Sequence, residues 1–419
     1  MLSNESRRLL SCQLRAFGEQ VRRLGIDLRA EARRLFDRLK LDGAIKALTP
    51  LERCQVDILE AAGQRDPAYG QRYAVDGGST HALRLENGTT LCAMQAVCSA
   101  EPDRRFQGLP LEAYRTVVLV SHSERLDLGL SHVDHLEEGF IHLWRVHLSR
   151  TYLREGIERV IKGLARAACE GQHVQWMLQQ LQPSEGLFLL DGNLYPIGLY
   201  YALSGQQDDR LSRDSRPNWT DWHPAQAIMA QPLRVVEAFA ERGLACIGLN
   251  KNPGTSWLLD FCLEEAERNW SGDAQFIKAV LSSRSRRSLG YTNWFVQERY
   301  PLPRSGGREL ESFDLFERLS GLGLKLAPRA YHLCFFYVYD PRIKSVLKVE
   351  APRVVLEAHD LQRLRRAIIA EIARGKGVPG ALRRADSRAR ITTEEAVGLL
   401  RACGIAPDYT FNQSRGAPL

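Results

Sequence analysis

Apolar residues recur along the first 45 positions of this chain in steps of four and three. The stripe contains Leu10, Leu14, Phe17, Val21, Leu24 and Leu28. Such steps place side chains on one face of a helix, so the pattern predicts a long heptad helix. Because the other faces are polar, the apolar stripe must dock either on the body of the protein or on a second copy. We favour a homodimer contact.

The rest of the chain alternates between short apolar runs and longer amphipathic stretches. Residues 71–76 predict a first strand, and two strand-like runs flank Asn87-Gly88, a dipeptide that accepts the positive φ angles of a tight hairpin. We expect further strands at 115–122 (in an insertion), 187–191, 244–252, 331–339 and 343–350. We expect helices over about 132–170, 224–242, 359–374, 380–388 and 393–403.

This order of elements predicts the fold class. Three antiparallel strands followed by alternating helices and parallel strands are typical of an α/β, ribonuclease H-like mixed sheet flanked by helices. In that order the first and fourth strands are parallel neighbours. We therefore predict an N-terminal helical dimerisation segment over residues 1–65 and a ribonuclease H-like domain with insertions over residues 66–419.

Composition narrows the class of protein. The 419 residues are 44% hydrophobic and 26% charged, as in a soluble globular protein, and no apolar run has the length needed to span a bilayer. Nine cysteines without a CxxC pair, and a start without a secretory signal, favour the reducing cytoplasm. The net charge is +7, and residues 359–390 hold nine Lys/Arg against three acids. Such basic segments suit a polyanion such as nucleic acid.

Two of the predicted strands end on an aspartate followed by glycine. Asp76 ends the first strand and Asp191 ends the fourth. Neighbouring parallel strands would bring both carboxylates to one sheet edge, where open α/β sheets place their sites. Two buried carboxylates repel each other unless a cation lies between them, and hard divalent cations prefer oxygen ligands. The pattern predicts a metal site that cleaves phosphodiesters, although each Asp-Gly could also be an ordinary turn.

Several motifs resemble the NurA nucleases in sequence and order. They are "YAVDGGST", "LFLLDGNLYPIGLYYAL", "IGLNKNPGTSWL" and "GALRRADSRARI", and the resemblance spans about residues 70–412. It implies a ribonuclease H-like core, Mn²⁺-dependent cleavage of DNA with Mg²⁺ as a second candidate ion, and a homodimer. It also implies a HerA-type hexameric DNA-translocating ATPase as partner, in DNA end resection and repair or in anti-phage defence.

The resemblance also implies roles for individual residues. Asp76 and Asp191 match the two family aspartates that hold metal, and Lys251 matches the lysine that follows the next strand. The Lys251 ammonium could hold a phosphate. A tail segment, "DYTFNQSRG", resembles the family's closing segment and includes Tyr409, Asn412 and Arg415.

The family glutamate lies on the helix between the two aspartates, and two residues compete for that place. In "TYLREGIERVIKGLA", Glu158 lies beside the apolar stripe of the predicted helix, whereas Glu155 lies almost opposite Ile157. We therefore predict Glu158 as the metal ligand and keep Glu155 as the alternative.

The last family element departs from its usual form. Many members carry Tyr-Pro, a short spacer and Ala-His, whereas this chain has Val378 at the tyrosine and Asp386 at the histidine. An aspartate can ligate the same metal, and its oxygens favour hard cations. We therefore predict Asp386 as the fourth ligand.

The sequence thus predicts a metal-dependent nuclease that acts on DNA ends, with Asp76, Glu158, Asp191, Lys251 and Asp386 at its site. An alternative from another class stays open, namely a catalytically weak dimeric adaptor that binds DNA and docks on an ATPase ring.

Overall fold

In the computed structural model, the described part of the chain comprises residues 3–85, 88–106, 108–111, 115–122, 135–138, 140–146, 156–204, 225–283, 285–301, 312–402 and 404. Most of its strands join one mixed sheet. They are β1 (Ile45–Ala47), β2 (Arg53–Asp57), β3 (Arg72–Ser79), β4 (Leu83–Arg84), β5 (Thr90–Glu101), β8 (Arg115–His122), β9 (His135–Glu138), β10 (Ile141–Val146), β11 (Leu187–Asp191), β12 (Ala245–Asn250), β13 (Ser288–Thr292), β14 (Phe295–Gln297), β17 (Leu333–Asp340) and β18 (Ser345–Pro352). Two small ribbons stand apart, β6 (Arg105–Phe106) with β7 (Leu109–Pro110) and β15 (Tyr300–Pro301) with β16 (Ser312–Phe313).

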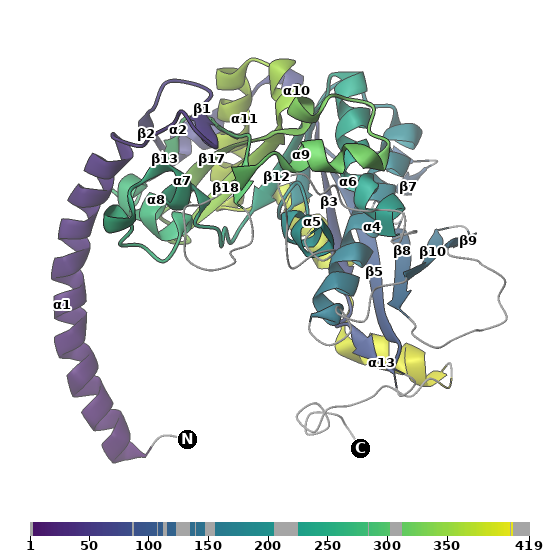
Figure 1. The fold of residues 1–419 in the computed structure, drawn as a ribbon, viewed down its shortest axis with the longest axis horizontal. Helices are drawn as coiled ribbons and strands as arrows, with labels where there is room; N and C mark the ends of the chain where they lie inside the picture. The colour runs from purple at the N-terminus through teal and green to yellow at the C-terminus, as the bar shows by residue number, and fades with distance from the viewer. Residues whose placement is uncertain are drawn as a thin grey trace.

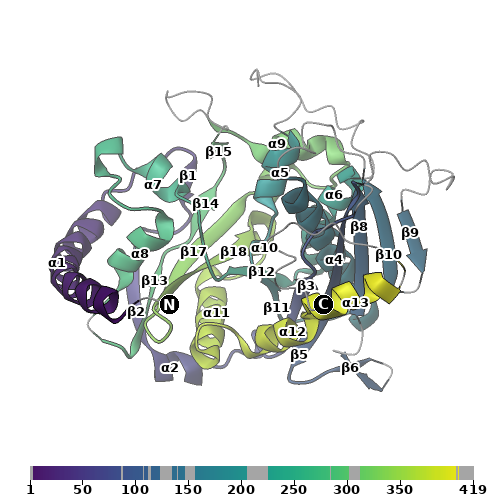
Figure 2. The ribbon, with the colours of Figure 1, turned by 90° about the horizontal axis from the view of Figure 1, so that it is seen from below.

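Helices cover both faces of this sheet (Figures 1 and 2). They are α1 (Asn4–Phe36), α2 (Ile58–Gly63), α4 (Ile157–Leu181), α5 (Ile197–Ser204), α6 (Ala225–Arg242), α7 (Trp257–Cys262), α8 (Asp273–Leu281), α9 (Leu315–Arg318), α10 (Arg353–Glu357), α11 (Leu361–Gly375), α12 (Gly380–Ala389) and α13 (Thr393–Ala402). Alternate residues of β17 show the two faces: Phe336 packs in the core that includes α11 and α12, whereas Phe335 and Tyr337 pack in the core that includes α7 and α8.

The centre of the sheet has the strand order β8-β5-β3-β11-β12. β3 is antiparallel to β5 and parallel to β11, and β11 is parallel to β12. The prediction that the first and fourth strands are parallel neighbours is therefore confirmed. The uniformly apolar runs of β11 and β12 suit strands with helices on both faces.

The third strand of the predicted antiparallel set was wrongly placed. Asn87-Gly88 follows the short strand β4, which pairs with the start of β5 (Leu83 opposite Leu91), and Asn87 itself lies outside the described residues. β8 pairs along β5 and is the third long strand of the sheet, not an insertion. The hairpin signal was correct, but it marks only a small flap between β3 and β5.

A helix expected from about residue 132 to residue 170 is also wrong over its first half. β9 and β10 occupy part of that stretch, and β10 is parallel to β8 and antiparallel to β9. His142, Trp144 and Val146 are buried and their neighbours are more exposed, which is the alternation of a strand. α4 begins only at Ile157 and continues to Leu181.

Most of the other predicted elements are confirmed. β11, α6, β12, the β17–β18 hairpin and the closing helices α11, α12 and α13 lie within a few residues of their expected positions. β1 and β2 fall within residues 1–65, yet they pair with β14 and β13. Part of the predicted N-terminal segment therefore shares the main sheet, and the division at residue 65 remains a prediction. No helix in the described ranges combines the length and apolarity needed to cross a membrane.

The long first helix is confirmed, and its two halves have different surroundings. Near its C-terminal end, Ala32 and Phe36 are fully buried in a core that α8 shares. Its N-terminal half reaches away from the rest of the molecule (Figure 1), and Leu10, Leu14 and Phe17 are 46%, 62% and 61% exposed. The stripe therefore docks on the protein's own body at one end only, and its other end is open to a partner.

Candidate active site

Asp76 lies at the carboxyl end of the parallel pair β3 and β11. The register pairs Val75 with Leu190, so Asp76 and Asp191 each follow the last paired residues of neighbouring strands. Asp76 is only 3% exposed. The Gly77 N–H donates to its Oδ1 at 2.7 Å, and its buried Oδ2 has no hydrogen-bond partner among the described residues. A buried carboxylate oxygen without a donor is costly, which indicates a missing cationic or proton-donating group.

Lys251 joins the same edge of the sheet. It follows β12, and its Nζ lies 2.7 Å from Oδ1 of Asp191. The Lys251 side chain is 30% exposed and the Asp191 side chain 16% exposed. The structure therefore brings together the three predicted site residues that follow parallel strands.

The acidic side chain that α4 contributes is Glu170. If Gly77 carried a Cβ, that atom would lie 3.0 Å from Oε1 of Glu170, so the glutamate approaches β3 beside Asp76. Nε of Arg166 lies 2.9 Å from the same Oε1, one helical turn away. Arg166 also donates from Nη2 to the backbone carbonyl of Asp191 at 2.6 Å, and it thereby ties α4 to the end of β11.

Glu158, the predicted ligand, does not reach this cluster. It is exposed in the first turn of α4, twelve residues before Glu170, which corresponds to about 18 Å along the helix axis. The 25-residue helix is much longer than the five-residue strand β11, so only part of it lies beside the end of that strand. Glu155 lies outside the described residues. The amphipathic pattern of the sequence indicates which face of the helix is buried. It does not indicate which turn of that face lies beside Asp76.

Sequence reasoning missed Glu170 and Arg166, although one signal was present. Glu170 follows an almost uninterrupted run of small buried residues that contains Ala165, Ala167, Ala168 and Cys169. An acidic residue beside such a run must approach another backbone closely, and it needs a partner there.

Two glycines after Asp76 explain how these elements converge. A Cβ at Gly77 would lie 2.1 Å from Met94 Cε as well as close to Glu170, and a Cβ at Gly78 would lie 1.9 Å from the carbonyl oxygen of Ala389. α4 and α12 therefore contact β3 from opposite faces at successive residues, and only glycine leaves room for both. The Asp-Gly-Gly sequence thus serves close packing around the carboxylate rather than a turn.

Negative charge dominates the electrostatics of the cluster. Burial, followed by the charges of Asp191 and Glu170, raises the pKa of Asp76 to about 8. Burial also raises the pKa of Glu170 to about 7, and the Arg166 guanidinium opposes that rise. Beyond burial, the charge of Asp191 raises the pKa of both Asp76 and Glu170, and the charge of Arg166 opposes both rises only in part.

Asp386 lies on α12, which packs beside the cluster. Its carboxylate is not among the clustered acids. α12 packs against β3 and β5, and the carbonyl of its last residue, Ala389, accepts a hydrogen bond from the Gln95 side chain at 2.9 Å. The Asp386 carboxylate is exposed and makes no hydrogen bond or ion pair with any residue that the structure describes. Its role as fourth ligand therefore remains a prediction. The tail residues Tyr409, Asn412 and Arg415 lie outside the described part of the chain.

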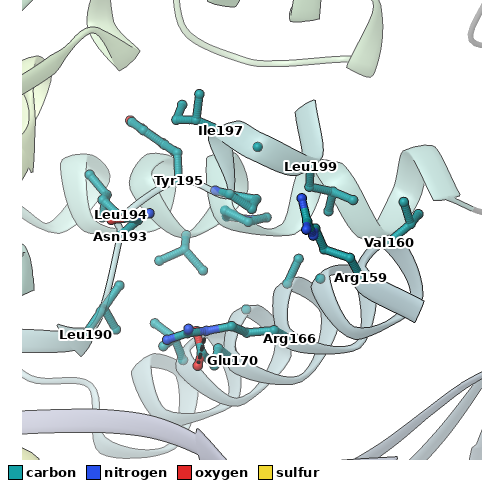
Figure 3. A pocket seen from close by; sticks show the side chains of 18 residues that line it. Arg159, Val160, Arg166, Glu170, Leu190, Asn193, Leu194, Tyr195, Ile197 and Leu199 are labelled. Carbon is teal, nitrogen blue, oxygen red and sulfur yellow. Dashed lines mark hydrogen bonds and ion pairs between the residues drawn. The ribbon is translucent and has the colours of Figure 1, made fainter. Parts of the chain in front are cut away.

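A pocket of about 380 Å³ opens beside Glu170 (Figure 3). α4, α5, α6 and the segment after β11 surround it. Arg159, Arg166 and Glu170 lie on its α4 wall, while Tyr195 and Leu199 contribute apolar surface. Of the three clustered acids, Glu170 is the one that lines this pocket.

As the side chains stand, no three His, Cys, Asp or Glu residues in the described ranges are close enough together to hold a metal ion. Arg166 and Lys251 instead hold Glu170 and Asp191 through ion pairs. A metal would therefore have to draw these carboxylates away from their cationic partners.

Comparison with known proteins gives a family match over the region that contains this site. The model of the NurA domain matches residues 70–391. Among curated proteins, none matches this sequence.

Structural comparison finds similar solved structures, and three of them are structures of NurA proteins. The NurA nuclease from Sulfolobus solfataricus is 11% identical, with 95% of this chain and 96% of that chain covered and a TM-score of 0.49. NurA with manganese is 9% identical, with 92% and 97% covered and a TM-score of 0.41. NurA bound to dAMP and manganese is 12% identical, with 96% and 97% covered and a TM-score of 0.40.

Proposed function

This chain belongs to the NurA family, and from that premise we propose that it is a metal-dependent nuclease that hydrolyses phosphodiester bonds at DNA ends. The observation that carries the proposal is the buried, unpartnered Oδ2 of Asp76 beside Asp191 and Glu170. The strand order β8-β5-β3-β11-β12 supports a ribonuclease H-like core, which holds such carboxylates at the ends of its first and fourth strands.

The chemistry of the donors fits a divalent cation. All three clustered acids offer oxygen, the donor that Mg²⁺ and Mn²⁺ prefer, and their mutual repulsion would be relieved by a cation. Asp76, Asp191 and Glu170 would hold the ion, and Asp386 is the proposed fourth ligand. When bound, such an ion polarises a phosphoryl oxygen and activates a water molecule.

Basic side chains around the acids would hold the substrate. Lys251 Nζ lies within ion-pair distance of Asp191, so it can hold a phosphate oxygen next to the metal ligands. Arg166 would keep the Asp191 carbonyl and the Glu170 carboxylate in place. The pocket beside them has room for part of a nucleotide.

A cleavage assay tests this function directly. End-labelled linear DNA should be degraded with Mn²⁺, the ion that the family resemblance implies, more slowly with Mg²⁺ and not at all with EDTA, because a divalent ion would polarise the phosphoryl oxygen and activate the water. The released label is measured on a gel. Equal degradation in EDTA would refute the metal dependence. Retained DNA binding without cleavage under any ion would favour the adaptor alternative.

We also propose that the protein acts as a cytoplasmic homodimer with a HerA-type hexameric ATPase. The exposed apolar half of α1 supports the dimer, because Leu14 and Phe17 lie open to solvent on an extended helix.

Light scattering should therefore give twice the chain mass of 47.3 kDa. The double substitution Leu14→Glu and Phe17→Glu should shift the protein to a monomer, since it places charges in the apolar contact. Leu59→Glu is the matched control, because Leu59 is 82% exposed on another helix, α2, and its substitution should leave the dimer intact. A wild-type monomer at micromolar concentration would contradict the prediction.

A further inference from the structure

A second polar groove lies between α11 and the segment that leads into β3, away from the carboxylates. Its volume is about 630 Å³, and residues 64–72 form one wall. Five arginines and two acids line it, which leaves three positive charges in excess. The arginines are Arg65, Arg72, Arg363, Arg366 and Arg374. We call this feature the arginine groove.

Ion pairs within the arginine groove leave two of its cations without a carboxylate contact. Arg363 pairs with Asp66 at 2.5 Å, and Arg72 and Arg374 share Glu371.

The other two arginines provide two of the three excess charges. Arg65 donates only to the backbone carbonyls of Ala62 and Gln64 among the described residues. Arg366 is exposed and forms no hydrogen bond or ion pair with a described residue. These two side chains can therefore accept an anionic ligand without first breaking an ion pair.

Ion pairs join the groove to α12, the helix that packs on Gly78 beside the carboxylates. Glu101 lies 3.3 Å from Arg72 in the groove and 3.4 Å from Arg384 on α12. α12 contacts α11 and lies beside it in Figure 2. Arg388 is exposed near the end of α12, whose last residue packs on Gly78, two positions after Asp76. A basic surface therefore runs from the groove along α12 towards the carboxylates.

We propose that the arginine groove and the exposed side of α12 bind the phosphate backbone of the DNA strand outside the cleavage site. The inference rests on the proposed nuclease function and adds to it a second, non-catalytic DNA contact. Planar guanidinium groups pair with phosphate oxygens through two hydrogen bonds. β3 separates Arg72 from Asp76 by four residues, or about 13 Å. A strand bound at both places must therefore span more than one nucleotide.

The test measures DNA binding in EDTA, so that it needs no cleavage. A fluorescein-labelled oligothymidylate of about twenty nucleotides, longer than the ~4–16 nucleotides of a typical single-strand site, is titrated with the full chain at several KCl concentrations. The double variant Arg366→Gln, Arg388→Gln removes two cations that make no ion pair. Arg234→Gln is the matched control, because Arg234 is equally exposed on α6, on the opposite face of the sheet. Melting temperatures confirm that each variant folds.

We expect the double variant to bind about tenfold more weakly near physiological salt. The slope of log K against log[KCl] should become shallower by about 1.4, since each lost phosphate contact on a single strand accounts for about 0.7. The control should match the wild type. A double variant with wild-type affinity and slope would overturn the proposal. So would unchanged DNA binding with lost binding of polyglutamate, which would assign the groove to an acidic protein. If the wild type cleaves no DNA with any ion while the double variant still shows the weaker binding, the nuclease proposal falls and the groove assignment stands.

Discussion

Asp191→Asn should lower the rate of DNA cleavage by two orders of magnitude or more, at about the level seen when one strong electrostatic contact to a transition state is lost. The substitution keeps the shape of the side chain but removes a charge that the proposed metal requires. Metal-free stability should change by no more than about 1 kcal/mol, because the lost ion pair with Lys251 is offset by weaker repulsion of Asp76 and Glu170. Nuclease rate and melting temperature are measured on one preparation.

The pH dependence of stability provides a check that needs no activity. The pKa of Asp76 rises from 3.8 to about 8 on folding, in part through the charge of Asp191. A carboxyl with a raised folded-state pKa stabilises the protein below its unfolded pKa, and this contribution disappears as the pH rises through the folded value. The wild type in EDTA should therefore lose stability between about pH 4 and pH 8, and Asp191→Asn should lose less. A variant that loses as much stability as the wild type and still cleaves DNA would remove Asp191 from the site.

Glu170→Gln should also reduce cleavage by about a hundredfold or more, whereas Glu158→Gln should stay within about twofold of the wild type. Both residues lie on α4 and undergo the same chemical change, but only Glu170 approaches Gly77 and Asp76. Comparing the two variants therefore separates the effect of where the carboxylate lies on α4 from the effect of removing a negative charge from the helix.

Binding of Mn²⁺, measured by calorimetry, should weaken with Glu170→Gln and stay unchanged with Glu158→Gln. The reverse pattern would restore Glu158 as the ligand and would mean that α4 sits differently on the sheet when metal is bound. The melting temperature of each variant, measured beside the wild type, confirms that it remains folded after Glu170 loses its ion pair with Arg166.

The sequence predicted those parts of the site that depend on strand order. Asp76, Asp191 and Lys251 each follow a strand with a clear apolar run, and parallel neighbours necessarily end at the same edge. The prediction of Glu158 rests on the family resemblance and on the face of the helix. Which turn of α4 lies beside Asp76 depends instead on packing between residues far apart in the chain, and there the structure has Glu170.

The errors in the predicted fold have the same cause, because a local pattern does not show how residues far apart in the chain pack together. In β10, His142 and Trp144 occupy buried positions that a soluble helix could also use, so a short segment with polar buried residues was ambiguous. The two halves of α1 carry one continuous stripe, and nothing in that stripe shows that Leu35 is buried while Phe17 is exposed. Asp386 is a third case, because the motif places it on α12 without fixing the direction of its carboxylate.

The contact of α12 with Gly78 has a consequence for the growing chain on the ribosome. Asp76, Glu170 and Asp191 emerge early, but the Ala389 carbonyl that packs on β3 is 294 positions away from its hydrogen-bond partner Gln95. Until that contact forms, β3 is covered at Gly77 by α4 alone, and Gly78 lacks the helix that packs on it. A nascent chain can therefore complete the close packing beside Asp76 only after α12 has been made.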